Sequence, residues 1–242
     1  MPFLLLLLLS LALSIGIGII VLLIRRAQEK APCEQISSNR SAPCPYREAC
    51  LFRRPGCWLA IKSRSLPAVQ SALGVHNPKP CSLTQGLAGD EKLFIAPPVK
   101  GWVLVTGSGL PDPSEDIDAC FRFILDVSRR LGQVQFFCAS RVLHHHAWVK
   151  ADRGRVIRAY AWAGQTLWHQ GSCTPAEKDL DLKCFDYTES AAYPFFIQDE
   201  TLCSNVDKVP LLAARWSLDP ARIDERQLDA ECGIAGELSR RY

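Results

Sequence analysis

Three consecutive histidines, His144 to His146, are the most conspicuous side chains that could do chemistry. In a strand, the two-residue repeat puts the imidazoles of His144 and His146 on one face, about 6 to 7 Å apart. Two imidazoles could share a metal ion, but a catalytic zinc needs a third ligand, and only His169 or a carboxylate without recognisable spacing is available. The pattern therefore favours partly exposed histidines at the start of a strand over a metal site, and it identifies no cofactor.

A glycine-rich turn, Gly107-Ser108-Gly109, stands between a predicted strand and a predicted helix, where phosphate-binding loops occur. Asp112 and Glu115 place negative charge where a phosphate would bind, and no third glycine follows at the required spacing. Ser108 also lacks the Gly-x-Ser-x-Gly pattern of a hydrolase nucleophile. We therefore expect a structural turn.

An aromatic and basic strand face is the strongest candidate for binding. In the predicted strand from Val156 to Trp162, the side chains of Arg158, Tyr160 and Trp162 share one face, and Trp148 on a neighbouring strand could extend it. Exposed Trp, Tyr and Arg are typical of surfaces that bind a protein partner. The alternative is that a long loop on this face or the C-terminal segment covers these side chains, and the sequence leaves both possibilities open.

The elements that must position these residues follow from apolar periodicity and turn residues. Short apolar runs predict strands at 58–61, 93–95, 102–105, 134–140, 145–150, 156–162 and 166–168. The last four of these strands are expected to form an antiparallel meander. Helical spacing and caps predict helices at 66–73, 113–131, 175 to about 184, and 200–216. The stretch 76–80, with two prolines, is expected to interrupt regular structure.

The helix from Pro113 to Leu131 has the clearest signals. Asp112 is the expected N-cap, with proline at the first helical position, and Gly132 is the expected stop. Its apolar stripe predicts the central core helix and consists of Ile117, Cys120, Phe121, Ile124, Leu125, Ser128 and Leu131.

The segment from Phe3 to Ile24 contains 22 residues without a charge, long enough to span a bilayer. A cleavable signal peptide fits less well, because no basic residue precedes the run and Arg25-Arg26 follows it in place of a small-residue cleavage site. We expect an uncleaved single-pass helix that contacts the lipid bilayer through residues 3–24. Because basic residues flank its C-terminal side, the N-terminus should lie outside and the body in the cytoplasm.

The chain contains eleven cysteines, which argues against a cytoplasmic body, since cysteine-rich domains usually belong to oxidising compartments. Their spacing matches neither zinc knuckles nor a redox Cys-x-x-Cys pair. Several lie in apolar patterns and are expected to be small core residues, namely Cys120, Cys138 and Cys184. The interpretation we favour is reduced thiols.

Composition and charge exclude several classes of protein. Apolar residues make up 48% and charged residues 22%, which excludes collagen, long coiled coils and wholesale disorder. The formal charge of +3 comes largely from Arg25, Arg26 and Lys30 beside the predicted anchor. Without a basic excess in the body, we expect no nucleic-acid partner.

The chain therefore divides into an anchor with a basic flank (1–30), a Cys- and Pro-rich linker (31–56), a folded domain (57–224) and a polar tail (225–242). The predicted class is α+β, with a mostly antiparallel sheet and helices packed on one face. No complete catalytic constellation is present, so the leading hypothesis is a non-catalytic binding or scaffolding domain. The alternative is a metal-assisted hydrolase that uses His144 and His146.

Four runs of sequence resemble an uncharacterised family of bacterial proteins: LFIAPPVKGWVLVTGSGLPDP, CFRFILDVSRRLGQVQFF, HHHAWVKADRGRVIRAYAWAGQTLWHQG and AARWSLDPARID. The resemblance covers roughly Trp58 to Asp224. It implies a bacterial, membrane-attached protein, and it carries no activity, cofactor or catalytic residue.

Overall fold

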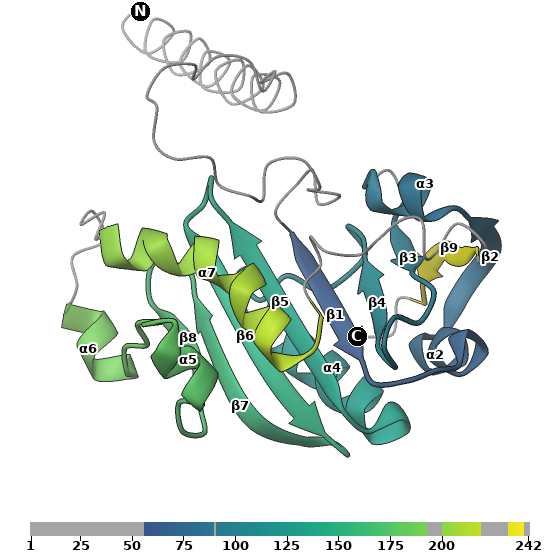
Figure 1. Ribbon diagram of the computed structural model, residues 1–242. Helices are drawn as coiled ribbons and strands as arrows, with labels where there is room; N and C mark the ends of the chain where they lie inside the picture. The colour runs from purple at the N-terminus through teal and green to yellow at the C-terminus, as the bar shows by residue number, and fades with distance from the viewer. Residues whose placement is uncertain (1–55, 90, 193–199, 219–231, 240–242) are drawn as a thin grey trace, which may run out of the picture. The chain divides into compact units, whose positions relative to one another are not determined.

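The computed structural model describes residues 56–89, 91–192, 200–218 and 232–239 (Figure 1). No helix within these ranges is long and apolar enough to cross a membrane, and the predicted span 3–24 lies outside them. The chain separates into two units, Met1–Cys44 and Pro45–Tyr242, and all described residues belong to the second.

A single sheet of nine strands forms the centre of the described domain, in the order β2-β9-β3-β4-β1-β5-β6-β7-β8. Every pair of neighbouring strands is antiparallel, as predicted for most of the sheet. The strands are β1 (Cys57–Ile61), β2 (Val75–Cys81), β3 (Leu93–Ile95), β4 (Val103–Thr106), β5 (Val134–Ser140), β6 (His145–Asp152), β7 (Arg155–Trp162), β8 (Thr166–Gln170) and β9 (Gly233–Leu238).

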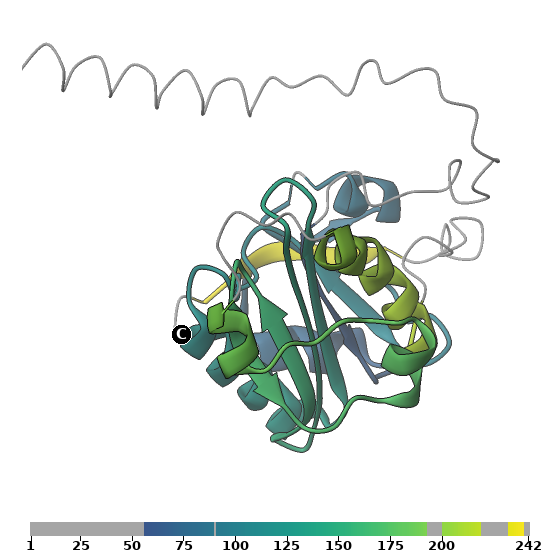
Figure 2. The ribbon, with the colours of Figure 1, turned by 90° about the vertical axis from the view of Figure 1, so that its left-hand side faces the viewer.

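Helices cover both faces of this sheet, so the prediction of helices on one face is wrong (Figures 1 and 2). The helices α2 and α4 pack on one face, and α3, α5 and α7 on the other. Central strands are apolar on both sides, as Phe136 and Phe137 on opposite faces of β5 show, and each side needs a cover. The helices are α2 (Leu66–Leu73), α3 (Leu83–Leu87), α4 (Ile117–Leu131), α5 (Pro175–Asp179), α6 (Tyr187–Ala192) and α7 (Glu200–Trp216).

Helix α4 begins four residues later than predicted. Its N-cap is Asp116, whose side chain accepts a hydrogen bond from the backbone N–H of Ala119 at 2.8 Å. Asp112 caps only the preceding turn, where its carboxylate accepts from the N–H of Ser114 at 2.8 Å. The end of the helix is as predicted, because Gly132 provides a positive φ of 81° there.

The buried side of α4 also differs at one aromatic position. Phe123 is completely buried against the sheet, whereas Phe121 is only partly buried. The ring of Phe121 packs edge-on against Trp168, with centroids 5.2 Å apart. Phe123 is therefore the aromatic side chain that fills the core beneath the sheet.

The expected polar tail contributes a strand to the sheet. β9 lies between β2 and β3 and pairs with both. Glycine is required there, because a Cβ on Gly233 would meet the ring of Phe94, and one on Gly236 would meet Val75 and the carbonyl of His76. β2 was expected to be irregular and is instead an edge strand, the position in a sheet where prolines are tolerated.

We predict that Phe123→Ala lowers the free energy of unfolding by about 3 to 5 kcal/mol, because it leaves a cavity under the sheet. Phe121→Ala should cost roughly half as much or less, since that ring is partly exposed already. Arg122→Ala, between them on the exposed side of α4, is the matched control and should stay within about 0.5 kcal/mol of the parent. Urea denaturation of the full chain in mild detergent measures all three, and equal midpoints for Phe123→Ala and Arg122→Ala would show that the assigned core is wrong.

Candidate functional site

The four predicted binding residues lie together, but beneath the surface. Arg158, Tyr160, Trp162 and Trp148 are all buried, and Arg158 has no exposed area. The prediction of an exposed aromatic and basic surface is therefore wrong, and the alternative of a covering C-terminal segment is correct. Helix α5 and helix α7 form this cover (Figure 1).

An ion pair between Arg158 and Glu177 is the centre of this buried group. Arg158 Nε donates to Glu177 Oε1 at 2.8 Å, and Trp148 Nε1 donates to the same oxygen at 2.7 Å. The other oxygen, Oε2, accepts from the N–H and the hydroxyl of Thr174, both at 2.7 Å. Glu177 thus closes the capping box of α5, which the Thr174-Pro175-x-Glu177 pattern predicts, and compensates a buried guanidinium at the same time.

The remaining guanidinium nitrogens of Arg158 also have partners. Nη1 donates to three backbone carbonyl oxygens, those of Ala159, Gln170 and Gly171, at 2.9 to 3.2 Å. Nη2 contacts the sulfur atoms of Cys173 at 3.6 Å and Cys184 at 3.1 Å. Burial raises the pKa of the Cys184 thiol far above its usual range, so this sulfur is held as a neutral thiol.

By residue type, this group could hold a metal ion, because one ligand atom each of Cys173, Glu177 and Cys184 lie within 4.8 Å of one another. The contacts argue against a cation there. Both oxygens of Glu177 are already engaged, and the positive charge of Arg158 lies against the two sulfurs. The arrangement fits a pair of thiols better than a divalent metal.

The histidine cluster divides between solvent and core. His144 precedes β6, is exposed and has a left-handed backbone with φ of 52°, so the strand alternation that would align it with His146 does not extend to it. His146 is buried, with Nε2 3.2 Å from the side-chain nitrogen of Asn205 and its ring stacked on Trp148. Burial lowers the pKa of His146 to about 3, so its imidazole is neutral at physiological pH. This placement does not favour a metal shared by His144 and His146.

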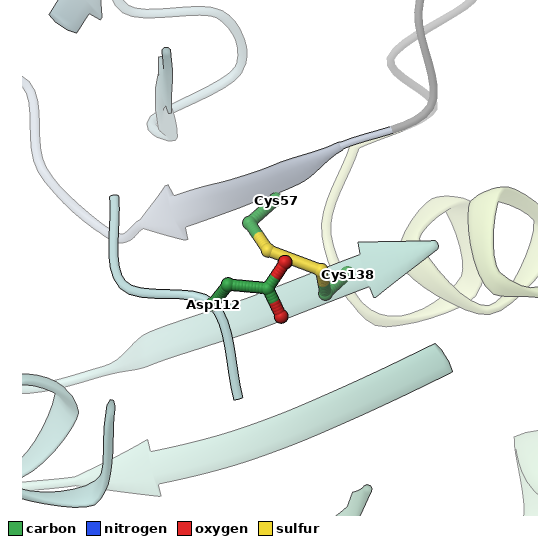
Figure 3. A group of neighbouring side chains, drawn as sticks. All are labelled: Cys57, Asp112 and Cys138. Atoms are coloured by element: carbon green, nitrogen blue, oxygen red, sulfur yellow. A yellow bond between two sulfur atoms is a disulfide. The ribbon is translucent and has the colours of Figure 1, made fainter. Parts of the chain in front are cut away.

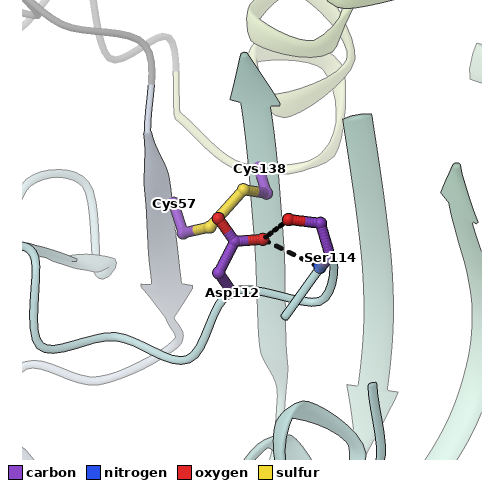
Figure 4. Close-up of a disulfide and its surroundings, with 4 residues drawn as sticks. All are labelled: Cys57, Asp112, Ser114 and Cys138. Atoms are coloured by element: carbon purple, nitrogen blue, oxygen red, sulfur yellow. Dashed lines mark hydrogen bonds between the residues drawn. A yellow bond between two sulfur atoms is a disulfide. The ribbon is translucent and has the colours of Figure 1, made fainter. Parts of the chain in front are cut away.

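A second group of cysteines lies where β1 begins. Cys57 and Cys138 face each other across the β1–β5 pair and form a disulfide, contrary to the expectation of reduced thiols at these positions (Figure 3). The carboxylate of Asp112 lies within 4.8 Å of both sulfurs, held by the N–H and hydroxyl of Ser114 (Figure 4). The bond closes a separation of 81 residues, which should stabilise the fold by about 4 to 5 kcal/mol. Because both sulfurs are bonded to each other, the disulfide form leaves no thiolate here for a metal.

The glycine-rich turn is structural, as predicted. The N–H of Gly109 donates to the carbonyl oxygen of Lys92 at 2.7 Å. A Cβ on Gly107 would collide with that same carbonyl group. The turn therefore needs glycine for a close backbone approach.

The β5–β6 hairpin carries an exposed apolar tip that the sequence patterns did not indicate. Val142 is 75% exposed and Leu143 is 56% exposed, and they are adjacent in the turn. The other large exposed apolar side chains of the described residues, Ile157 and Tyr187, are on separate elements. An apolar pair between Arg141 and His144 in a predicted turn was the signal that could have identified it. We call residues 141–144 the hairpin tip.

Comparison with protein-family models, with curated proteins and with solved structures finds no match for this chain. The similarity to a bacterial family therefore stays a prediction, and the function has to be argued from the geometry alone.

We predict that Arg158→Met destabilises the fold by about 3 to 5 kcal/mol, because it leaves the Glu177 carboxylate buried without its cation. Adding Glu177→Gln should restore part of that loss, since the double variant removes the unpaired charge. The control is Arg215→Met on α7, which breaks the exposed ion pair between Arg215 and Asp179. Asp179 is on α5, as Glu177 is, and this variant should lower the free energy of unfolding by less than about 1 kcal/mol. Urea melts of the full chain decide between them, and a cost for Arg158→Met no larger than the control would contradict the assigned role.

We predict that His146 makes the fold sensitive to acid. Its folded pKa of about 3 lies below the unfolded value near 6.5, so the unfolded chain binds the proton more tightly. This contribution is fully present above pH 6.5 and is lost as the pH falls toward 3, at about 1.4 kcal/mol per pH unit at most. His146→Gln should flatten the dependence of stability on pH in that window relative to the parent. An unchanged slope would show that another group is responsible.

Proposed function

We propose that this chain is a single-pass membrane protein whose α+β domain is a non-catalytic binding module, and that the hairpin tip is its contact surface. The observation that carries the proposal is the exposed pair of Val142 and Leu143, the two adjacent large apolar side chains that the described domain presents to solvent. Exposed neighbouring apolar residues of this kind indicate a contact site.

The chemically versatile side chains of the described domain support a non-catalytic role. Arg158 and Glu177 are fully engaged with each other and with the backbone, and His146 is buried between aromatic rings and Asn205. A hydrolase based on His144 and His146 is not favoured, because His144 is exposed before β6 whereas His146 is buried within it.

Two contacts tie the hairpin tip to the rest of the domain, which favours binding. Arg141 Nε forms an ion pair with Asp207 of α7 at 2.6 Å, and the N–H of Leu143 donates to the hydroxyl of Ser140 at 3.3 Å. A fixed loop loses less conformational entropy when it binds than a flexible one does. The apolar pair is thus presented in a defined position.

The position of the tip points to the membrane surface as what it contacts. The N–H of Ala139 donates to the carbonyl of Gly56, and Cys138 pairs with Cys57, so the tip lies at the end of the sheet where β1 begins (Figure 1). In sequence, β1 is the first described strand after the predicted anchor. Apolar side chains beside an arginine are suited to the boundary between acyl chains and anionic headgroups. Burying Val142 and Leu143 there would contribute on the order of 2 to 4 kcal/mol.

The test is a photo-crosslinking residue placed at Val142 in the full chain in native membranes. We expect lipid adducts, because the tip lies in the headgroup region. The matched control is the same residue at Arg155, which is exposed at the opposite end of the β6–β7 pair. Leu143→Asp should reduce the adducts at position 142, since it opposes insertion. Equal labelling at both positions would contradict the proposal, and protein adducts at 142 alone would replace the bilayer by a protein partner.

The same membranes report the orientation, for which we keep the cytoplasmic proposal based on Arg25 and Arg26. A membrane-impermeant protease added to right-side-out cells should then leave the body intact. Cleavage of the body together with an intact Cys57–Cys138 disulfide would place the domain on the oxidising side.

A further inference from the structure

We propose that Cys173 and Cys184 are a redox-active dithiol that forms a second, reversible disulfide across the segment carrying α5. This site is independent of the hairpin tip and of the Cys57–Cys138 bond, which lies at the start of β1. The reaction partner of this dithiol is a small-molecule or protein disulfide that exchanges with thiols.

The fold, and not a short sequence motif, brings the sulfurs of Cys173 and Cys184 close together. Both cysteines are free, both are partly buried, and their sulfurs lie within 4.8 Å of each other. The same nitrogen, Nη2 of Arg158, contacts both sulfurs, at 3.6 and 3.1 Å, which fixes them on one side of the guanidinium. Arg158 is itself immobilised by Glu177 and three carbonyls, so the pair is held in place.

The local backbone leaves room for the bond to form. Cys173 precedes α5 and Cys184 follows it, and both lie outside the helices and strands. Rotation of the two side chains can therefore bring the sulfurs to bonding distance without breaking a ladder of hydrogen bonds. By contrast, the buried free thiol of Cys120 lies within α4, and no other free cysteine is grouped with it among the described residues.

The reaction balances with oxidised glutathione as the oxidant. One protein thiol loses its proton as it attacks the glutathione disulfide, forms a mixed disulfide and releases one glutathione. The second protein thiol then loses its proton as it attacks the protein sulfur of the mixed disulfide, and it releases the other glutathione. Two protein thiols become one disulfide, and their two protons and two electrons appear in two molecules of reduced glutathione.

The consequence is a covalent clamp on the cover of the sheet. The segment between the two cysteines contains α5, whose Glu177 pairs with Arg158, and Leu180, which follows α5 and packs against the core of that face. Oxidation would tie both ends of this segment together over the ion pair. Reduction would leave the segment held by noncovalent contacts alone.

The test uses the full chain in detergent, equilibrated with reduced and oxidised glutathione at graded ratios and then alkylated under denaturing conditions. Mass spectrometry of peptides should show loss of alkylation at Cys173 and Cys184 with one common midpoint, a linked peptide lighter by two hydrogens, and full recovery after dithiothreitol. Cys120 should stay alkylated at every ratio and serves as the internal control.

Two variants keep the proposal open to contradiction. In Cys173→Ser, Cys184 should remain alkylated or carry glutathione, whereas Cys57→Ser should leave the Cys173–Cys184 midpoint unchanged. Separate midpoints for the two cysteines, or preferential linkage of either to the exposed Cys232, would overturn the proposal. Stoichiometric zinc that survives dialysis in the parent and is lost in Cys173→Ser would also overturn it, because the site would then be a metal site.

Discussion

The need to cover two apolar faces of one sheet determines most of this structure. In β1 and β5, successive side chains alternate between two cores, and nearly all of them are apolar and buried. An antiparallel sheet with one solvated face would show polar residues at alternate positions, and these strands do not. Helices α2 and α4 therefore close one side, and the chain after β8 has to return across the other.

That returning chain explains why a charged pair lies inside the domain. Helix α5 has to begin over β6 and β7, where its cap meets the indole of Trp148 and the guanidinium of Arg158. One carboxylate then caps the helix, neutralises the arginine and accepts from the indole. Removing either charge alone would leave the other uncompensated, so the pair fixes how the cover sits on the sheet.

Much of the fold could be predicted from local patterns. The meander from β5 to β8 and helices α2 and α7 have the expected places, because their signals are periodicity, caps and turn residues within a few positions. The predicted start of α4 was wrong because Asp112 and Asp116 are both suitable N-caps, and Asp112 caps only the preceding turn. Local sequence does not show which of the two aspartates caps the helix, because the turn between them is set by how the chain packs.

The rest depended on contacts between distant segments. The burial of Arg158 is decided by a helix that begins at Pro175, and the Cys57–Cys138 bond by the register of two strands far apart in sequence. β9 has a single β-branched residue, Ile234, and its strand signal is weak because its neighbours leave room only for glycine at Gly233 and Gly236. The apolar pair of the hairpin tip is visible in the sequence. Its proposed role as a contact surface depends on which end of the sheet it occupies, and only the fold shows that.

The place of β9 in the sheet has a consequence during synthesis of the protein. Among the described strands, β2 pairs only with β9, which leaves the ribosome roughly 150 residues later, or about 8 to 30 s at about 5 to 20 residues per second. Until then β2 has no partner strand and β3 has one open edge. Two proline residues in β2, Pro78 and Pro80, lack the N–H groups that a foreign strand would need there, so the nascent chain carries its own protection against premature pairing.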